Sequence, residues 1–176
     1  MSFAKAKPGV PGARDYIGNS DGPAAGKRAG TEEWVRQAAK YSNGALWNNG
    51  TYGQRDVRSK PGTLSVHATG RAMDLSYRKM DTKGVKEGRA VSKVFIDKVL
   101  ANANAFGIQM VIDYWPKPWG ASWRCDRQAW KVYETKTVSG SPGGDWWHVE
   151  LSPAMADNPE AVKAIFEATF GVSTTA

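Results

Sequence analysis

The sequence contains very little cysteine and histidine, and both shortages limit the chemistry open to it. The chain of 176 residues has one cysteine, Cys125, and two histidines, His67 and His148. A single cysteine excludes a disulfide bond within the chain and leaves the redox compartment undecided. Because no histidine is left over to activate Cys125, we expect an inert thiol rather than a nucleophile.

Long apolar runs are missing as well. The opening stretch, MSFAKAKPGVPG, carries charges but no apolar run of signal-peptide length. No stretch approaches the ~20 apolar residues that a membrane-spanning helix needs. We therefore expect no membrane partner, and a protein that stays where it is made unless another process releases it.

Acidic residues are outnumbered by basic ones, with 17 Asp and Glu against 24 Lys and Arg and a formal net charge of +7. Such an excess favours encounters with anionic surfaces, among them nucleic acids, acidic lipids and cell-wall polymers. The basic residues are scattered along the chain, which is typical of a solvated surface. Since no helix-turn-helix pattern, zinc-finger spacing or RNA-binding signature accompanies them, we expect no nucleic-acid partner.

The length is typical of a single domain, and the composition, 41% hydrophobic and 23% charged, is typical of a globular chain. Residues 1–30 are rich in Gly and Pro with almost no apolar periodicity, which predicts a flexible N-terminal arm. The predicted folded domain covers residues 31–172, and residues 173–176 form a tail.

Three segments combine apolar periodicity with the end signals of helices: residues 31–41, 88–107 and 158–171. In the second segment, the predicted buried stripe consists of Val91, Val94, Phe95 and Val99. Gly107 is expected to end that helix, because glycine is favoured just after a helix C-terminus.

Aromatic and β-branched residues bounded by turn signals predict strands over residues 108–115, 128–134 and 145–151. Residues 115–123 are expected to form a long loop. Residues 43–62, dense in Asn and Gly, are expected to form loops with short strand pieces. Separated helices together with such strands predict an α+β domain, with a small antiparallel sheet and flanking helices.

His67 and Asp74 are seven residues apart in the stretch LSVHATGRAMDLS. On a helix this spacing gives a rise of about 10 Å, and on a straight strand it sends the two side chains to opposite faces. Neither regular element lets both side chains bind one ion. A bend at Gly70, where the missing Cβ permits a positive φ, would let them converge from adjacent segments.

His148, in GGDWWHVE, is the only other histidine and follows a double glycine. One aspartate and two histidines, with a fourth position left to water, form the ligand set expected of a catalytic zinc rather than a closed structural one. The residues alone leave a second interpretation open, in which each histidine is simply a hydrogen-bonded surface or core residue.

Two motifs resemble a known family. The first is S-x-H-x-x-G-x-A-x-D, with Ser65, His67, Gly70, Ala72 and Asp74, and the second is D-x-x-H-x-E, with Asp145, His148 and Glu150. Both are similar, in order and spacing, to motifs of the zinc D-alanyl-D-alanine carboxypeptidases (VanY-type) and the L-alanyl-D-glutamate endopeptidases of phage lysins. The resemblance covers residues 52–151 and excludes the first 30.

The resemblance implies a zinc site at the sheet of a hedgehog/D,D-peptidase-like fold, within a zinc peptidase domain of residues 31–172. His67, Asp74 and His148 would be the Zn²⁺ ligands. Asp145 would be the general base, at a position where many members have Glu.

Strand geometry conflicts with the assignment of the base. On an ideal strand Glu150 shares a face with His148, whereas Asp145 points to the other face. Either the strand bends at the double glycine, or Glu150 is the carboxylate nearer to the metal. We assign Asp145 as the base from its family position, and Glu150 as an outer partner that orients a ligand or a basic residue.

Four further residues are candidates for substrate contact. The family usually places an arginine near the reacting carbonyl or a substrate carboxylate, and Arg55 is the preferred candidate, with Arg58 as the alternative. Ser65 could bind substrate or fix a turn, and Trp146 could wall a groove. Loop solvation and core packing are the competing interpretations for the arginines and the tryptophan.

The predicted function is a peptidoglycan peptidase that hydrolyses the L-alanyl-D-glutamate bond of stem peptides, as phage lysins do. Such a protein would be made in the host cytoplasm without a signal peptide, reach the anionic cell wall after release and act as a monomer. The motifs do not distinguish this activity from a D-alanyl-D-alanine carboxypeptidase. A non-catalytic wall-binding module of the same fold, which keeps zinc only to stabilise the fold, is a further alternative.

Overall fold

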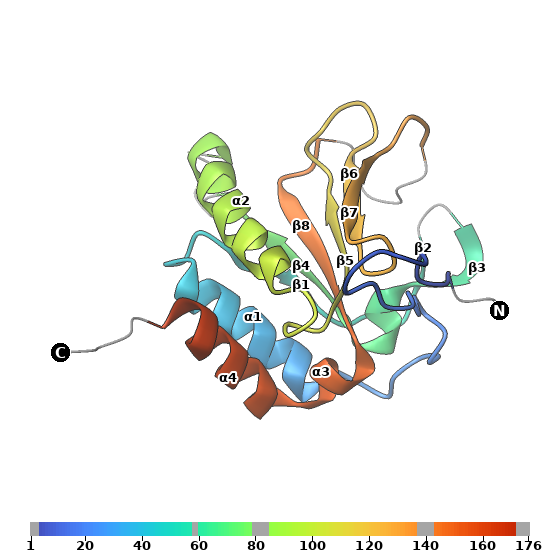
Figure 1. Cartoon of the computed structure of the whole chain (residues 1–176), viewed down its shortest axis with the longest axis horizontal. Helices are drawn as coiled ribbons and strands as arrows, with labels where there is room; N and C mark the ends of the chain where they lie inside the picture. The colour runs from blue at the N-terminus through green and yellow to red at the C-terminus, as the bar shows by residue number, and fades with distance from the viewer. Residues whose placement is uncertain (1–3, 58–59, 79–84, 137–142, 172–176) are drawn as a thin grey trace.

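The computed structural model describes residues 4–57, 60–78, 85–136 and 143–171. In these residues the chain forms a six-stranded sheet, ordered β1-β4-β8-β5-β6-β7, in which every neighbouring pair is antiparallel. The α-helices lie on one side of the sheet, and the N-terminal segment and the β2-β3 pair lie on the other (Figure 1). The predicted α+β domain, with an antiparallel sheet and flanking helices, is confirmed.

The strands of the large sheet are β1 (Trp47–Gly50), β4 (Ala72–Ser76), β5 (Ile108–Asp113), β6 (Ala121–Arg124), β7 (Ala129–Val132) and β8 (Trp146–Leu151). A separate antiparallel pair, β2 (Asp56–Val57) and β3 (Lys60–Leu64), leads into the 3₁₀ helix η1 (Val66–Thr69). The α-helices of the described residues are α1 (Ala29–Tyr41), α2 (Val85–Ala101), α3 (Pro153–Asp157) and α4 (Pro159–Phe170).

The core lies between the sheet and the helices. Alternate side chains of β8 enter it, and Trp147, Val149 and Leu151 are each no more than 1% exposed. From the helices, Trp34 of α1 and Phe166 of α4 meet edge to face, with ring centroids 5.0 Å apart. Because strand side chains alternate, the residues between the core positions of β8 point to the face that carries no helices.

α2 buries a different stripe from the predicted one. Phe95 and Val99 are buried as expected, but Val91 and Val94 are 52% and 71% exposed. Ser92 takes a place on the buried face, where its hydroxyl accepts a hydrogen bond of 2.9 Å from a core tryptophan indole on β8. The predicted stripe, which counted only apolar residues, was therefore wrong at Val91 and Val94 and omitted Ser92.

Some of the predicted boundaries were wrong. α2 ends at Ala101 rather than at Gly107, and turns fill the interval. Residues 115–123, predicted as a loop, include the first part of β6, which pairs with β5. The short helix α3 was not predicted.

Residues 4–28 pack against the domain instead of forming a separate flexible arm. Ala24 N donates a hydrogen bond of 2.8 Å to Ala68 O of η1. The Asp21 carboxylate accepts two hydrogen bonds of 2.8 Å from Arg71, whose side chain is fully buried. Because residues 4–28 contact the domain in this way, the predicted boundary at residue 30 does not separate two structural units. The contacts are polar and therefore leave no apolar periodicity in the sequence.

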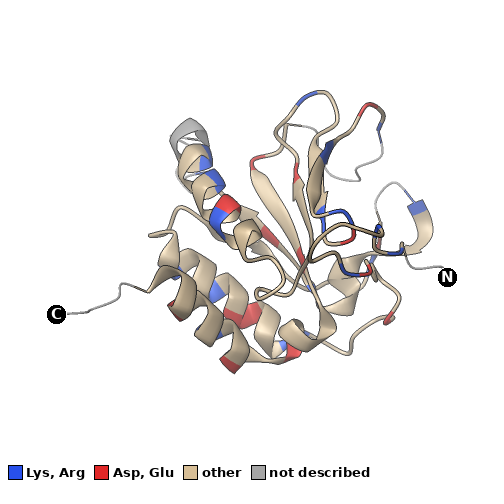
Figure 2. Cartoon of the chain, in the orientation of Figure 1, with Lys and Arg blue, Asp and Glu red and all other residues tan. Residues whose placement is uncertain are grey.

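Lys and Arg are spread over helices, strands and loops of the described chain (Figure 2). No described helix is long and apolar enough to cross a membrane. The predicted tail, residues 173–176, and the candidate Arg58 lie outside the described residues.

Candidate metal centre

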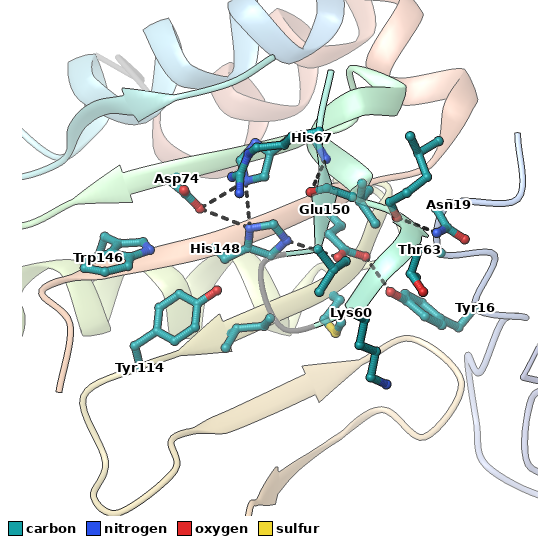
Figure 3. A pocket seen from close by; sticks show the side chains of 18 of the residues that line it. Tyr16, Asn19, Lys60, Thr63, His67, Asp74, Tyr114, Trp146, His148 and Glu150 are labelled. Carbon is teal, nitrogen blue, oxygen red and sulfur yellow. Dashed lines mark hydrogen bonds and ion pairs between the residues drawn. The ribbon is translucent and has the colours of Figure 1, made fainter. Parts of the chain in front are cut away.

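Three predicted ligand atoms meet at one point on the face of the sheet opposite the α-helices (Figure 3). His67 Nε2 lies 3.2 Å from His148 Nδ1 and 3.3 Å from Asp74 Oδ1. The distance between His148 Nδ1 and Asp74 Oδ1 is 3.0 Å. Both histidines are buried and Asp74 is partly buried. The predicted convergence of these side chains is confirmed.

A 3₁₀ turn, a glycine bend and a strand bring His67 and Asp74 together. His67 lies on η1, which is followed by Gly70 in the left-handed conformation, with φ 72°. A Cβ added there would lie 2.9 Å from Arg28 Cγ, so both conformation and space favour glycine. The chain then enters β4, where Asp74 lies directly opposite His148 of β8 in the antiparallel register.

Hydrogen bonds fix which nitrogen of each histidine faces the ligand group. His67 Nδ1 lies 2.9 Å from the backbone oxygen of Thr51, to which it donates, so Nε2 is free to act as a ligand. His148 Nε2 lies 3.0 Å from Glu150 Oε1, and Nδ1 faces the group. A backbone carbonyl and a carboxylate in these positions are the partners that commonly orient metal-bound histidines.

The arrangement fits a divalent ion with tetrahedral coordination. Imidazole nitrogen and carboxylate oxygen bind zinc at about 2.0–2.2 Å, so adjacent ligand atoms around such an ion lie about 3.3–3.5 Å apart. The three separations of 3.0, 3.2 and 3.3 Å are within a few tenths of an ångström of that spacing. His67, Asp74 and His148 can therefore hold a metal ion, and three protein ligands leave a fourth position open.

His148 lies between two carboxylates, Asp74 at Nδ1 and Glu150 at Nε2. Burial lowers the pKa of His148, but its hydrogen bonds to the carboxylates outweigh burial and raise that pKa to about 9. Burial raises the pKa of Asp74, but hydrogen bonds from His148 and His67 outweigh it and hold that pKa well below its usual range. In the metal-free protein, a proton on His148 therefore supplies the positive charge that these buried carboxylates need.

Metal binding is expected to release this proton, because a histidine ligand must be neutral. Since the pKa of His148 is raised to about 9, about one proton should leave per ion bound at pH 7. The apparent affinity should rise about tenfold per pH unit from pH 7 to 9 and then level off. Calorimetric titration in buffers of different ionisation enthalpy measures the proton count directly.

The stability of the metal-free protein should change with pH in the opposite direction to the metal affinity, and fall as the pH rises. The folded-state pKa of His148, about 9, lies above the ordinary value of 6.5, so its stabilising contribution is complete below about pH 6.5. That contribution is lost as the pH rises through about 9.

Binding without proton release at pH 7, and an affinity independent of pH, would show that His148 is already neutral.

The ligand group opens into a pocket of about 430 Å³. Tyr114 and Trp146 form an aromatic wall, with ring centroids 5.1 Å apart. Arg55 and Lys60 also line the pocket, and both are exposed. Their positive charges favour an anionic ligand beside the metal-binding group.

The other predicted contact residues are placed as follows. Ser65 lines the pocket and its hydroxyl accepts a hydrogen bond from His67 N at 3.3 Å, so it fixes the turn that carries a ligand. Trp146 and Arg55 line the pocket. Glu150 contacts His148 on the nitrogen that faces away from the ligand group, which matches the outer position predicted for it.

Asp145 precedes β8 and is not among the residues that line the pocket. Its carboxylate lies 3.4 Å from Arg78 Nη1, and its backbone oxygen accepts a hydrogen bond from Tyr77 N at 3.1 Å. The predicted conflict between Asp145 and the strand direction is therefore visible in the structure.

Sequence reasoning missed two residues that contact the ligand group, one directly and one through Glu150. Thr51 acts through its backbone oxygen, so its side chain gave no signal. Tyr16 donates a hydrogen bond of 2.8 Å to Glu150 Oε2 and lines the pocket, but it lies in the segment interpreted as a flexible arm.

Comparisons with known proteins give no family assignment, because no family model, curated protein or solved structure matches this chain. The candidate site therefore depends on the residues and the geometry described above.

Proposed function

We propose that this protein is a zinc-dependent peptidase that hydrolyses the L-alanyl-D-glutamate bond of peptidoglycan stem peptides. One observation carries the proposal. Three ligand atoms from two separate motifs meet with separations of 3.0–3.3 Å beside a pocket. The resemblance of both motifs to those of VanY-type carboxypeptidases and phage-lysin endopeptidases supplies the reaction class and the hedgehog/D,D-peptidase-like fold.

In this proposal His67, Asp74 and His148 hold Zn²⁺. The ion supplies a Lewis acid that polarises the scissile carbonyl and lowers the pKa of water. Glu150 and Thr51 keep the two imidazoles in the tautomers that leave Nδ1 of His148 and Nε2 of His67 free to bind.

Asp145 is the proposed general base and takes a proton from the attacking water, then gives it to the leaving amine. Its carboxylate lies 3.4 Å from Arg78 Nη1, so the proposed role requires this carboxylate to reach the attacking water from that position or after leaving Arg78. Arg55 is the proposed donor to the negative charge that develops on the carbonyl oxygen. It lines the pocket and is exposed there.

The pocket suits a short acidic peptide. Its volume of about 430 Å³ falls in the range of pockets that hold small ligands. Arg55 and Lys60 can meet carboxylates of a stem peptide, while Tyr114 and Trp146 can contact its apolar parts. The net charge of +7 would help to retain the protein on an anionic wall.

The lysin-like assignment includes a location: synthesis in the host cytoplasm and action on the wall after release, as a monomer. Two alternatives share the same site. A D-alanyl-D-alanine carboxypeptidase would use the same ligands, and a non-catalytic wall-binding module would keep the ion only to stabilise the fold.

Digestion of purified cell walls, followed by mass spectrometry of the new termini, tests the proposal. A free amine on D-Glu is the expected product, whereas released D-Ala would identify the carboxypeptidase instead. Chelator-treated protein is the matched control and should produce neither. Zinc-loaded protein that binds walls but creates no new amine would overturn both enzymatic assignments and leave the binding module.

A further inference from the structure

A chain of hydrogen bonds connects the N-terminal segment to a metal ligand. Tyr16 Oη donates to Glu150 Oε2 at 2.8 Å, and Glu150 Oε1 accepts from His148 Nε2 at 3.0 Å (Figure 3). Each oxygen of this carboxylate thus has a hydrogen-bond partner among the described residues. Since Glu150 is only 3% exposed, its orientation depends on these partners rather than on solvent.

The structure holds Tyr16 firmly in this position. The guanidinium of Arg124, on β6, lies 4.6 Å from the centre of the Tyr16 ring. Tyr16 N donates to Ala4 O, and the next residue, Ile17, donates its N–H to the Gln109 side chain at 3.0 Å. The phenol is therefore placed by a contact with its ring, by the hydrogen bond of its hydroxyl and by contacts along the backbone.

The rest of the segment is fixed to the elements that carry the ligands. Asp21 pairs with the buried Arg71, which directly precedes β4. Asn19 Nδ2 donates to Leu64 O at the end of β3, just before η1. Tyr16 and Asn19 also line the pocket. Through Asn19, Asp21 and Tyr16, the segment thus contacts residues that lie close to each of the three ligands in the sequence.

We propose that Tyr16 is a positioning residue for the metal centre, which acts through Glu150 to hold the His148 ring with Nδ1 facing the ion. This inference rests on the proposed function, because it requires that His67, Asp74 and His148 bind a metal. The physical reason is that partners of metal-bound histidines fix the ring orientation, and their loss typically weakens metal binding 10–100-fold. Tyr16 reaches His148 only through Glu150, one hydrogen bond further from the ion, so we expect a loss of metal affinity at the lower end of this range.

Tyr16→Phe tests the inference, because it removes only the hydroxyl and keeps the ring under Arg124. Tyr41→Phe is a matched control. Tyr41 also has a cation over its ring, Lys40 Nζ at 4.8 Å, but it stacks on Phe166 among the helices. Zinc affinity, measured by competition with a chromophoric chelator, should fall about tenfold in Tyr16→Phe and stay unchanged in Tyr41→Phe.

The visible spectrum of the cobalt(II)-loaded protein provides a second readout, which a purely structural role would not change. Tyr16→Phe should shift the absorption bands, whereas Tyr41→Phe should reproduce the wild-type spectrum. A double-mutant cycle with Glu150→Gln then identifies the path. If Tyr16 acts through Glu150, adding Tyr16→Phe to Glu150→Gln should weaken zinc binding by less than the tenfold seen in the wild-type background.

The outcomes separate this inference from the proposed function. A wild-type protein that binds no zinc would contradict the metal centre itself. Wild-type binding with an unchanged affinity and cobalt spectrum in Tyr16→Phe would overturn the role of Tyr16 alone. An equal loss of affinity in both Glu150 backgrounds would also overturn it, because Tyr16 would then act by another route.

Discussion

His148→Ala is expected to abolish zinc binding and wall hydrolysis together. The substitution removes one of three ligand atoms and also leaves Asp74 and Glu150 without the partner that lies 3.0 Å from each. Loss of an outer partner of a metal ligand costs about 10–100-fold in affinity, so loss of a ligand should cost more than about 100-fold. Zinc content after dialysis and the rate of wall lysis are the two measurements.

Arg36→Gln is a suitable control, because Arg36 is on α1 with its side chain 59% exposed. It should bind one zinc and lyse walls at the wild-type rate. Circular dichroism must show that His148→Ala is folded, since the substitution creates a buried gap. A folded His148→Ala protein that retains zinc and lytic activity would show that the ion is bound elsewhere.

Asp145→Asn is expected to reduce turnover by about 10²–10⁴-fold, the usual contribution of a general base. Its zinc affinity should be unchanged, because Asp145 contacts Arg78 and none of the three ligands among the described contacts. Kinetics on a soluble stem peptide would measure kcat and KM separately, and a lower kcat with little change in KM is the expected pattern.

Glu150→Gln is the informative comparison for Asp145→Asn. Glu150 holds the outer nitrogen of His148, so its replacement should weaken zinc binding, and activity should recover when zinc is supplied in excess. The opposite pattern would assign the general base to Glu150 instead of Asp145. If saturated Glu150→Gln were inactive and Asp145→Asn active, Glu150 would be the base, and the ion pair of Asp145 with Arg78 would be structural.

The ligand set was predicted partly from local geometry and partly from the resemblance of the two motifs to a known family, which links His148 to His67 and Asp74, 81 and 74 residues away. Gly70 is needed for a left-handed bend with φ 72°, and that bend brings the His67 turn beside the Asp74 strand. The face shared by His148 and Glu150 follows from the alternation of strand side chains. These relations involve short sequence separations or strict periodicity, so they can be read without knowing the fold.

The surroundings of the ligands could not be predicted in the same way. Tyr16 and Glu150 are 134 residues apart, and no periodic pattern links them. Thr51 contributes a backbone carbonyl, which every residue has. The N-terminal segment is fixed by polar contacts such as Asp21 with Arg71, so the absence of an apolar pattern wrongly suggested a flexible arm.

The buried face of α2 shows a related limit. Val91 and Val94 are apolar yet exposed, whereas Ser92 is polar yet buried with a hydrogen-bond donor on β8. Hydrophobicity alone cannot identify such a position, because the satisfied hydroxyl removes most of the cost of burying it. Only the position of the sheet shows which side of this helix faces the core.

The most direct test of the account is the metal content of the purified protein, combined with removal and return of the metal. We expect one zinc ion per chain, loss of wall lysis when a chelator removes it, and recovery of lysis when zinc is returned. Wall lysis that persists in protein shown to contain no metal would contradict the central claim that His67, Asp74 and His148 form a catalytic metal centre.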